Sequence, residues 1–404
     1  MDDTGLFAGL KVLDCASFIA GPAAATILSD FGADVIKIEP PGEGDSYRWL
    51  GKRPGGPVCA EDFASMITNR NKRSLALDLK SADGQAILRR LISQADVFVT
   101  NYPLGVREKL HLTWEDLHSL NPRLIYAGLS AYGEIGPEAS KTGFDATAYW
   151  ARSGLMDLVR VDAETMPARS VAGMGDHPTA LALFGGIVSA LYRREKTGRG
   201  GKVSASLLAT GLFSNGYMLQ AVLLGASLPP RPKREDSSNA LAGMYQTLDG
   251  RWITLAMLAE ERQWPAFLTA LNRPDLGTDP RFATQPPRRA NARALFDILE
   301  PIFLTKTLAD WRTLLDQAGL TFGIVGTTEE AAEDAQAHLI GAIRPFADRP
   351  GMTIDSPVQL DGEAKTTPRQ FPQLGQHSIE ILLEAGYEQA EIVGFLARAV
   401  IAAQ

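Results

Sequence analysis

Short apolar runs alternate with longer amphipathic stretches over the first 130 residues of the chain. The apolar runs predict strands at 11–15, 34–39, 96–100 and 124–129. The stretches between them predict helices at 22–31, 84–93 and 114–120. Strands that alternate with helices pair in parallel, because each helix carries the chain back to the start of the sheet. The pattern therefore predicts an α/β fold with a parallel, doubly wound sheet.

The pattern continues with a long helix at 179–195 and a strand at 202–207, and then changes. A polar, proline-rich linker occupies 228–236. Beyond it, Asp249-Gly250 is typical of a hairpin turn. Helical patterns follow at 264–271, 292–304 and 308–318. The second half of the chain is therefore expected to contain a smaller α+β domain, as the length of 404 residues also favours.

Composition narrows the possible partners and location. The formal net charge of -7 disfavours nucleic acid or an anionic membrane surface as a partner. No uninterrupted apolar run approaches the ~20 residues of a membrane span, and the first residues are acidic where a signal peptide is basic. The two cysteines, Cys15 and Cys59, provide no disulfide framework. We therefore expect no membrane partner, no nucleic-acid partner and a cytoplasmic location.

Common catalytic and cofactor motifs are missing from the sequence. The five histidines form no HxH or HExxH spacing and no CxxC occurs, so we expect no metal site. Gly128 to Gly133 misses the GxSxG elbow of serine hydrolases by one residue. Between Cys15 and Pro22 stands one glycine, Gly21, where dinucleotide cofactors require GxGxxG. The expected scaffold is therefore Rossmann-like, with a first helix whose start is free to receive another phosphate-bearing ligand.

Two segments carry candidate chemistry, and each has a second interpretation. Asp176 follows a glycine-rich stretch and begins the long helix, where the helix dipole would keep a nucleophilic carboxylate ionised. The same position suits an ordinary helix cap that contributes ~1 kcal/mol. Basic residues at 69–74 precede an alternating strand at 75–80, which suits a nucleotide with a charged rim or a plain edge strand.

Several segments together resemble the family III CoA-transferases, which include formyl-CoA and carnitine CoA-transferases. The resembling segments, in the order of the family, are Gly9-Leu10-Lys11-Val12-Leu13-Asp14, Ala20-Gly21-Pro22, 31–39, Asn71-Lys72-Arg73-Ser74, Asn121-Pro122-Arg123-Leu124-Ile125, Gly175-Asp176 and 194–200. The resemblance covers almost the whole chain, although the second half matches only loosely. It implies that Asp176 is the nucleophile of a transfer of coenzyme A from an acyl-CoA to a carboxylic acid.

The resemblance also implies an organisation and a CoA site. The implied domains are 1–215 as the first part of a large Rossmann-like domain, 216–325 as a small α+β domain, and 326–404 as a segment that returns to the large domain. Two subunits would interlock as a homodimer. Carried over by position, the residues that bind CoA are Ala20, Leu77, Lys80, Asn101, Tyr102 and Lys109.

Departures from the family pattern bear on the substrate. Pro40 stands where an arginine often contacts phosphate, and the loop at 237–243 has one glycine, Gly243, where formyl-CoA transferases have a run. The related α-methylacyl-CoA racemases need a histidine where this chain has Phe144, and phenylalanine carries no proton. Racemase activity is thus the disfavoured alternative, and a non-catalytic CoA-binding paralogue is another. Five side chains could form an apolar acyl pocket or belong to the core: Phe18, Phe144, Tyr149, Trp150 and Met174.

Overall fold

The computed structural model describes residues 5–52 and 54–404, and these residues form two compact units. The first unit comprises 1–156, 169–225 and 335–404, and the second comprises 157–168 and 226–334. The limits of independently folding domains, expected at 215 and 325, stay a prediction.

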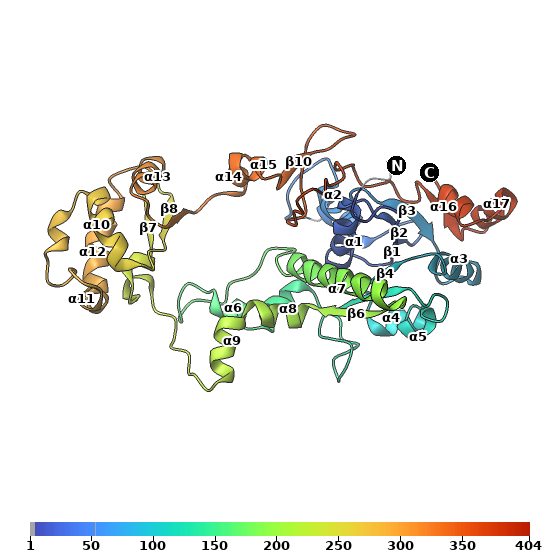
Figure 1. Ribbon diagram of the computed structural model, residues 1–404, viewed down its shortest axis with the longest axis horizontal. Helices are drawn as coiled ribbons and strands as arrows, with labels where there is room; N and C mark the ends of the chain where they lie inside the picture. The colour runs from blue at the N-terminus through green and yellow to red at the C-terminus, as the bar shows by residue number, and fades with distance from the viewer. Residues whose placement is uncertain (1–4, 53) are drawn as a thin grey trace. The chain divides into compact units, whose positions relative to one another are not determined.

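A seven-stranded sheet forms the centre of the first unit (Figure 1). Its order is β12 (Ile401–Ala402), β3 (Arg73–Leu77), β2 (Asp34–Glu39), β1 (Lys11–Asp14), β4 (Val97–Thr100), β5 (Ile125–Ser130) and β6 (Gly201–Ser206). All neighbours pair in parallel except β12, which is antiparallel to β3. The order 3-2-1-4-5-6 is that of Rossmann folds. The predicted fold class is confirmed.

Helices cover both faces of this sheet. On one face, α1 (Ala20–Asp30) and α7 (Asp176–Thr197) pack on the strands through mostly small side chains of the first helix. Every residue of α1 is buried, because its run of alanines lets the backbone lie close to the sheet. On the other face lie α3 (Ala82–Ile92), α5 (Trp114–Leu117), α16 (Ser378–Glu384) and α17 (Gln389–Ala397). The sheet is therefore buried on both faces, as parallel sheets require.

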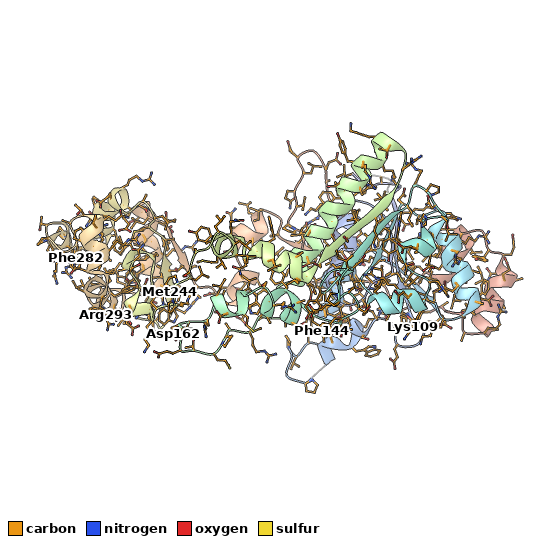
Figure 2. The ribbon with its side chains drawn as sticks, turned by 90° about the horizontal axis from the view of Figure 1, so that it is seen from below. Lys109, Phe144, Asp162, Met244, Phe282 and Arg293 are labelled. Atoms are coloured by element: carbon orange, nitrogen blue, oxygen red, sulfur yellow. The ribbon has the colours of Figure 1, made fainter. Side chains whose placement is uncertain are left out.

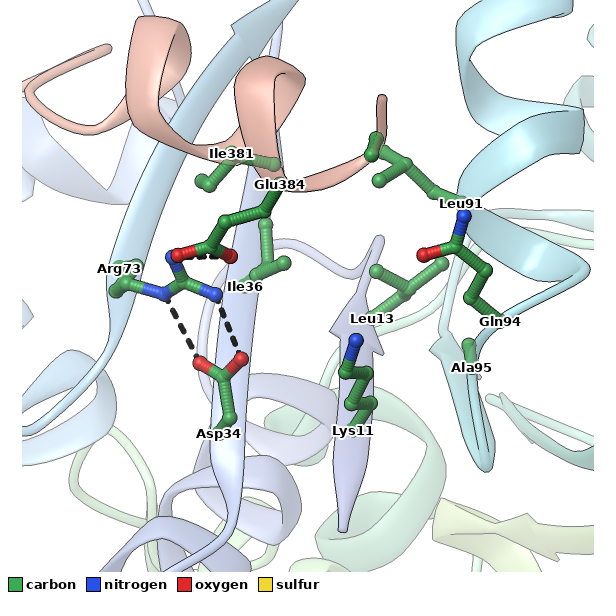
Figure 3. Close-up of a pocket in the computed structure, with 11 residues that line it drawn as sticks. Lys11, Leu13, Asp34, Ile36, Arg73, Leu91, Gln94, Ala95, Ile381 and Glu384 are labelled. Carbon is green, nitrogen blue, oxygen red and sulfur yellow. Dashed lines mark hydrogen bonds and ion pairs between the residues drawn. The ribbon is translucent and has the colours of Figure 1, made fainter. Parts of the chain in front are cut away.

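The C-terminal segment returns to the first unit and is fastened at the amino ends of the strands. Arg73, at the start of β3, forms a bidentate ion pair with Asp34, at the start of β2. The distances are 2.9 Å from Nε to Oδ1 and 2.6 Å from Nη2 to Oδ2. The same guanidinium reaches the Glu384 carboxylate of α16 at 2.9 Å (Figure 3). The pocket beside this cluster has a volume of only ≈ 20 Å³. These charges hold the returning helix and leave no space for a ligand larger than water.

The basic segment before β3 is used inside the protein. Lys72 is completely buried and donates to Asp14 at 2.7 Å, and Arg70 forms a two-bonded pair with Asp30. All five residues of β3 are buried, and β12 covers the side of β3 away from β2. Both sequence-based interpretations of this segment, a charged rim for a nucleotide and a plain edge strand, are therefore wrong for these residues.

The second unit has a separate core. Its antiparallel sheet contains β7 (Met244–Gln246), β8 (Trp252–Leu255) and β9 (Phe322–Ile324), and the hairpin expected at Asp249-Gly250 joins the first two. The helices α10 (Glu260–Leu271), α12 (Ala292–Phe303) and α13 (Leu308–Gln317) pack with this sheet around Phe267, Phe296 and Trp311. The remaining elements are short, and the expected α+β character of this part is confirmed.

Candidate active site

The candidate active site lies in the first unit, at the carboxyl ends of β1, β4 and β5. In this sheet the strand order reverses between β1 and β4, and ligands of doubly wound folds bind at such a point. A cavity of ≈ 480 Å³ opens there. It is lined by Ser17, Phe18, Ile19, Ala20, Leu50, Asn101, Tyr102, Pro103, Leu104, Arg107, Leu129, Ser130, Ala131, Glu134, Ala139, Lys141, Thr142, Gly143, Phe144, Asp145, Ala172, Gly173, Asp176 and Leu207.

Two side chains from neighbouring strand ends hold the turn between β1 and α1. The Asn101 amide accepts from the Ser17 N–H at 2.8 Å and donates to the Ser17 carbonyl at 2.7 Å. Asp45 accepts from the N–H of Phe18, which has a φ of 61°, a conformation that costs a non-glycine residue about 1 kcal/mol or more. Lys37 donates to Asp45 at 3.0 Å. This strained turn replaces the glycine-rich phosphate loop of dinucleotide-binding proteins.

Asp176 is the first residue of α7, after Gly175 in the cap position. Gly175 is required because a Cβ there would lie 2.5 Å from the Tyr149 ring, so the helix start packs directly on that ring. The Tyr149 hydroxyl in turn donates to Ser214 at 2.8 Å. Among the described residues, no group donates a hydrogen bond to the Asp176 side chain, which faces the cavity. The interpretation of Asp176 as an ordinary cap is therefore wrong.

Burial and a second carboxylate together raise the pKa of Asp176. Burial raises the pKa of Asp176, and the nearby Asp145 carboxylate raises it further, to about 7. Asp145 is itself buried and accepts from the Gly175 N–H at 3.4 Å, just before the helix. The helix dipole favours the charged form, but burial and like charge outweigh it. The expectation that the helix start keeps Asp176 ionised is thus wrong near neutral pH, where the carboxyl is partly protonated.

Both cations that line the cavity already have partners. Arg107 is buried and donates to the carbonyls of Tyr102 and Leu129, at 2.6 and 2.7 Å, and to the Glu134 carboxylate. Lys141 pairs with Glu138 at 2.8 Å, outside the cavity lining. The cavity therefore contains two carboxylates, Asp145 and Asp176, that form no ion pair with any cation in the described part of the chain.

The residues predicted to bind CoA divide into three groups. Ala20, Asn101 and Tyr102 line the cavity together with Asp176. Lys80 and Lys109 line a second groove, with Leu79, Ser81, Ala82, Gln85, Val106, Leu110 and His111. Leu77 is 1% exposed in the core, so its side chain is closed to a ligand.

The short helix α4 (Leu104–Lys109) connects the two sites. It contributes Leu104 and Arg107 to the cavity, and Val106 and Lys109 to the groove. Lys109 and Phe144, labelled in Figure 2, thus belong to adjoining sites of the same unit. The groove with its two exposed lysines therefore lies beside the cavity, on the same short helix.

The five aromatic and sulfur-containing candidates also separate. Phe18 and Phe144 line the cavity and meet edge to face, with their ring centroids 5.8 Å apart. Tyr149 and Trp150 are buried in a core cluster, and Met174 is about half exposed and is not part of the lining. Two of the five therefore line the cavity, and the other three do not.

Sequence patterns missed Asp45, Arg107 and the carboxylate of Asp145 as parts of the site. The missing information is tertiary: Asp145 reaches Gly175 over 30 positions of the sequence, and Asn101 reaches Ser17 over 84. Residues directly after β1, β4 and β5 would have been found by one rule, that ligands bind at the carboxyl ends of parallel strands.

Comparison with known proteins agrees with this geometry. The model of CoA-transferase family III matches residues 7–378. The chain belongs to that family. The family III member described here is similar to (R)-2-hydroxy-4-methylpentanoate CoA-transferase of Clostridioides difficile, with 34% identity over 96% of this chain and 98% of the relative. It is also similar to cinnamoyl-CoA:phenyllactate CoA-transferase of Clostridium sporogenes, with 32% identity over 97% and 96%.

Solved structures support the same assignment. A CaiB/BaiF family protein from Brucella suis superposes with a TM-score of 0.83 and 29% identity, over 95% of this chain and 100% of the other. This family III protein is a CoA-transferase, with acyl-CoA and carboxylic acids as substrates. In the part of the chain that the structure describes, no helix combines the length and apolar character needed to cross a bilayer. Among the same described residues, there is no cluster of three or more His, Cys, Asp or Glu side chains that could bind a metal ion.

Proposed function

We propose that Asp176 is the nucleophile that carries coenzyme A between two carboxylic acids. The observation that supports this role most strongly is an unpartnered carboxylate at a helix start, facing a cavity at the switch point of the sheet. Its ionised form attacks the thioester carbonyl of the donor, and the C–S bond breaks. The products are an aspartyl-acyl mixed anhydride and CoA thiolate, so no proton is needed.

The thiolate then attacks the aspartyl carbonyl of the anhydride. The C–O bond to the donor acyl group breaks, the donor acid leaves as a carboxylate, and Asp176 becomes a β-aspartyl-CoA thioester. An acceptor carboxylate runs the two steps in reverse: it displaces the thiolate to form a new anhydride, and the thiolate attacks the acceptor's acyl carbon. Asp176 is released as a carboxylate. At the start of α7 the N–H groups of His177 and Thr179 already donate to Gly173 and Gly175, so the Asp176 N–H is the proposed oxyanion donor, worth about 10²–10³ in rate.

The nucleotide end of CoA is proposed to occupy the groove. Lys80 and Lys109 are exposed there, and neither forms an ion pair within residues 5–52 and 54–404. The pantetheine arm would pass α4, and the thioester would lie between Ala20, Asn101, Tyr102 and Asp176. Since Pro40 supplies no charge, these two lysines are the candidates for the missing phosphate contact. A contact with Leu77 would have to use its main chain.

The protein is also proposed to act as an interlocked homodimer in the cytoplasm. Helix α9 (Gly216–Leu223) has no buried residue, although it is rich in apolar side chains. Tyr217, Leu223 and the following Leu224 are each at least 70% exposed. An apolar surface of this kind favours cover by another subunit. The net charge of -7 and the absence of a disulfide framework favour the cytoplasm.

The proposed intermediate can be trapped. The protein is incubated with a panel of acyl-CoA donors and then with hydroxylamine or borohydride, and peptides are analysed by mass spectrometry. We expect modification of Asp176 only after exposure to a donor. Asp83→Asn is the matched control, because Asp83 is also a carboxylate in the first turn of a helix of this unit. Modification elsewhere, or full transfer by Asp176→Ala, would contradict the mechanism.

The same preparation separates the alternatives. A racemase or isomerase would incorporate solvent deuterium at the α-carbon of the acyl group, which Phe144 disfavours because it carries no proton. A non-catalytic paralogue would bind CoA in calorimetry and would never exchange labelled acid into acyl-CoA. We expect exchange of labelled acid without deuterium incorporation.

A further inference from the structure

The wall of the cavity around Asp176 is apolar on several sides. Phe18 and Phe144 meet edge to face, and the other large aliphatic side chains of the lining are Ile19, Leu50, Leu104, Leu129 and Leu207. Tyr47 lies behind Phe18, with a centroid distance of 6.2 Å, in a small core cluster. A bulky apolar group on the substrate would therefore displace water from this apolar wall. The gain in binding free energy is roughly 25 cal/mol per Å² of apolar surface buried.

The charges of the cavity disfavour a second acidic group on the substrate. Of the lining residues, all of which lie in the described part of the chain, only Arg107 and Lys141 are cations. Arg107 is saturated by two carbonyls and Glu134, and Lys141 is paired with Glu138. Asp145 remains as a carboxylate after Asp176 has been acylated. A distal carboxylate on the substrate would thus lose water, find no free cation and be repelled by Asp145.

We infer that this cavity selects monocarboxylic acids with a branched or aromatic apolar side chain and rejects dicarboxylic acids, with Phe144 and Phe18 as the specificity-determining residues. This inference rests on the proposed function of Asp176. Phe144 is 60% exposed, so its ring contributes little to the core and is available to contact a substrate.

A hydrogen bond to Asp45 holds Phe18 in its strained backbone conformation. Its N–H donates to Asp45, whose carboxylate also accepts from the Tyr47 N–H at 3.0 Å and from Lys37 at 3.0 Å. Asp45 is buried and therefore fixes both aromatic residues with one side chain. Asp45 is thus a positioning residue for the apolar wall.

The test compares two acids of nearly the same shape. Succinate and 4-methylpentanoate have the same number of non-hydrogen atoms, and a carboxylate in the first replaces an isopropyl group in the second. Each acyl-CoA is incubated with its own labelled acid, so that one compound serves as donor and acceptor. Mass spectrometry measures the initial rate at which label enters the thioester. We expect 4-methylpentanoate to exchange at least about tenfold faster at equal subsaturating concentration, since an uncompensated charge costs more than one factor of ten.

Variants at Phe144 test the assignment to residues. Phe144→Lys supplies the missing cation and should lower the ratio of 4-methylpentanoate to succinate exchange by about tenfold or more. Phe144→Leu keeps an apolar side chain and should leave 4-methylpentanoate preferred. Leu383→Lys, at an exposed leucine of α16 outside the cavity lining, controls for added charge and should leave the ratio unchanged.

Three results would overturn the inference. Succinate exchange equal to or faster than that of 4-methylpentanoate by the unmodified protein would contradict the selectivity. A ratio that Phe144→Lys does not change would contradict the role of Phe144. Acetate exchange is measured in parallel to distinguish a failure of the selectivity from a failure of the proposed function. If none of the three acids is exchanged, transfer through Asp176 is contradicted, and the selectivity that rests on it is contradicted as well.

Discussion

The two edges of the central sheet use carboxylates in opposite ways. At the amino edge, Asp34 and Glu384 both bond to the Arg73 guanidinium, and the adjoining pocket holds little more than water (Figure 3). At the carboxyl edge, Asp176 lacks a donor in the described structure and lines a cavity together with Asp145. At the amino edge the charged groups are therefore paired and stabilise the fold. At the carboxyl edge the ionised form of Asp176 destabilises the fold and is open to the cavity. The difference suits a nucleophile, because a saturated carboxylate attacks poorly.

Asp176→Asn should produce the largest effect and should separate function from stability. The variant keeps the shape of the side chain but loses the proposed nucleophile, so acid exchange into acyl-CoA should fall by about 10⁴-fold. The initial exchange rate, measured with acetyl- or 4-methylpentanoyl-CoA, checks this. Circular dichroism should show an unchanged fold, since no described group donates to the aspartate that is replaced.

The same variant should be more stable than the parent at high pH. The folded pKa of Asp176 is raised to about 7, above the ~3.9 of an unfolded aspartate. Below pH 4 both states are protonated and the two proteins should have equal stability. Between pH 4 and 7 the unfolded chain releases its proton first, so the parent loses stability as the pH rises. Urea unfolding at pH 8 should favour Asp176→Asn by about 2 kcal/mol, allowing for water in the cavity. Equal stability at pH 8 would contradict an electrostatic penalty at Asp176.

Arg73→Leu tests the opposite edge and should have the opposite signature. It leaves Asp34 without its two-bonded partner and frees the carboxylates of α16, so the free energy of unfolding should fall by about 3 kcal/mol. Exchange activity of the folded fraction should stay the same at 10 °C, because the cluster is remote from the cavity lining. Urea denaturation and exchange assays on one sample measure both values. An activity loss larger than the unfolded fraction explains would show that the two edges are coupled.

Asp145→Asn tests how much the neighbouring carboxylate contributes to the raised pKa of Asp176. Removing the like charge should lower the pKa of Asp176 from about 7 by roughly one unit, a change of about 1.4 kcal/mol. Because the ionised carboxylate attacks, the acid limb of kcat/KM against pH should move down by the same amount. The asparagine Oδ1 can still accept from Gly175 N–H, so the helix start keeps its contact. An unmoved acid limb would assign the raised pKa to burial alone.

Local patterns predicted one edge better than the other. The strands expected at 34–39 and 124–129 were predicted from their apolar runs, and the structure has them at Asp34–Glu39 and Ile125–Ser130, almost entirely buried. Arg70, Lys72 and Arg73 each pair with an aspartate 39 to 58 positions earlier, and Arg73 also pairs with Glu384, 311 positions later. Neither the basic rim nor the edge strand weighed for this segment was therefore found; the basic residues form buried ion pairs instead. The helix start at Asp176 was expected from its glycines, whereas the raised pKa of Asp176 depends on burial and on Asp145, which no local pattern connects to it. Long-range pairing of charge is thus the information that a single sequence does not display.

Lys109→Ala should give the smallest change and extends the comparison to cations. Lys109 is exposed in the groove, and removal of one phosphate contact should weaken CoA binding by about three- to tenfold, mostly at low salt. Lys11→Ala is the matched control: Lys11 is an exposed lysine at the amino edge, beside the Arg73 cluster, and its removal should leave affinity unchanged. Calorimetry with CoA and with dephospho-CoA at two salt concentrations measures both. Equal effects of the two variants would mean that CoA senses only the net charge of the protein, in which case the groove does not hold the phosphates.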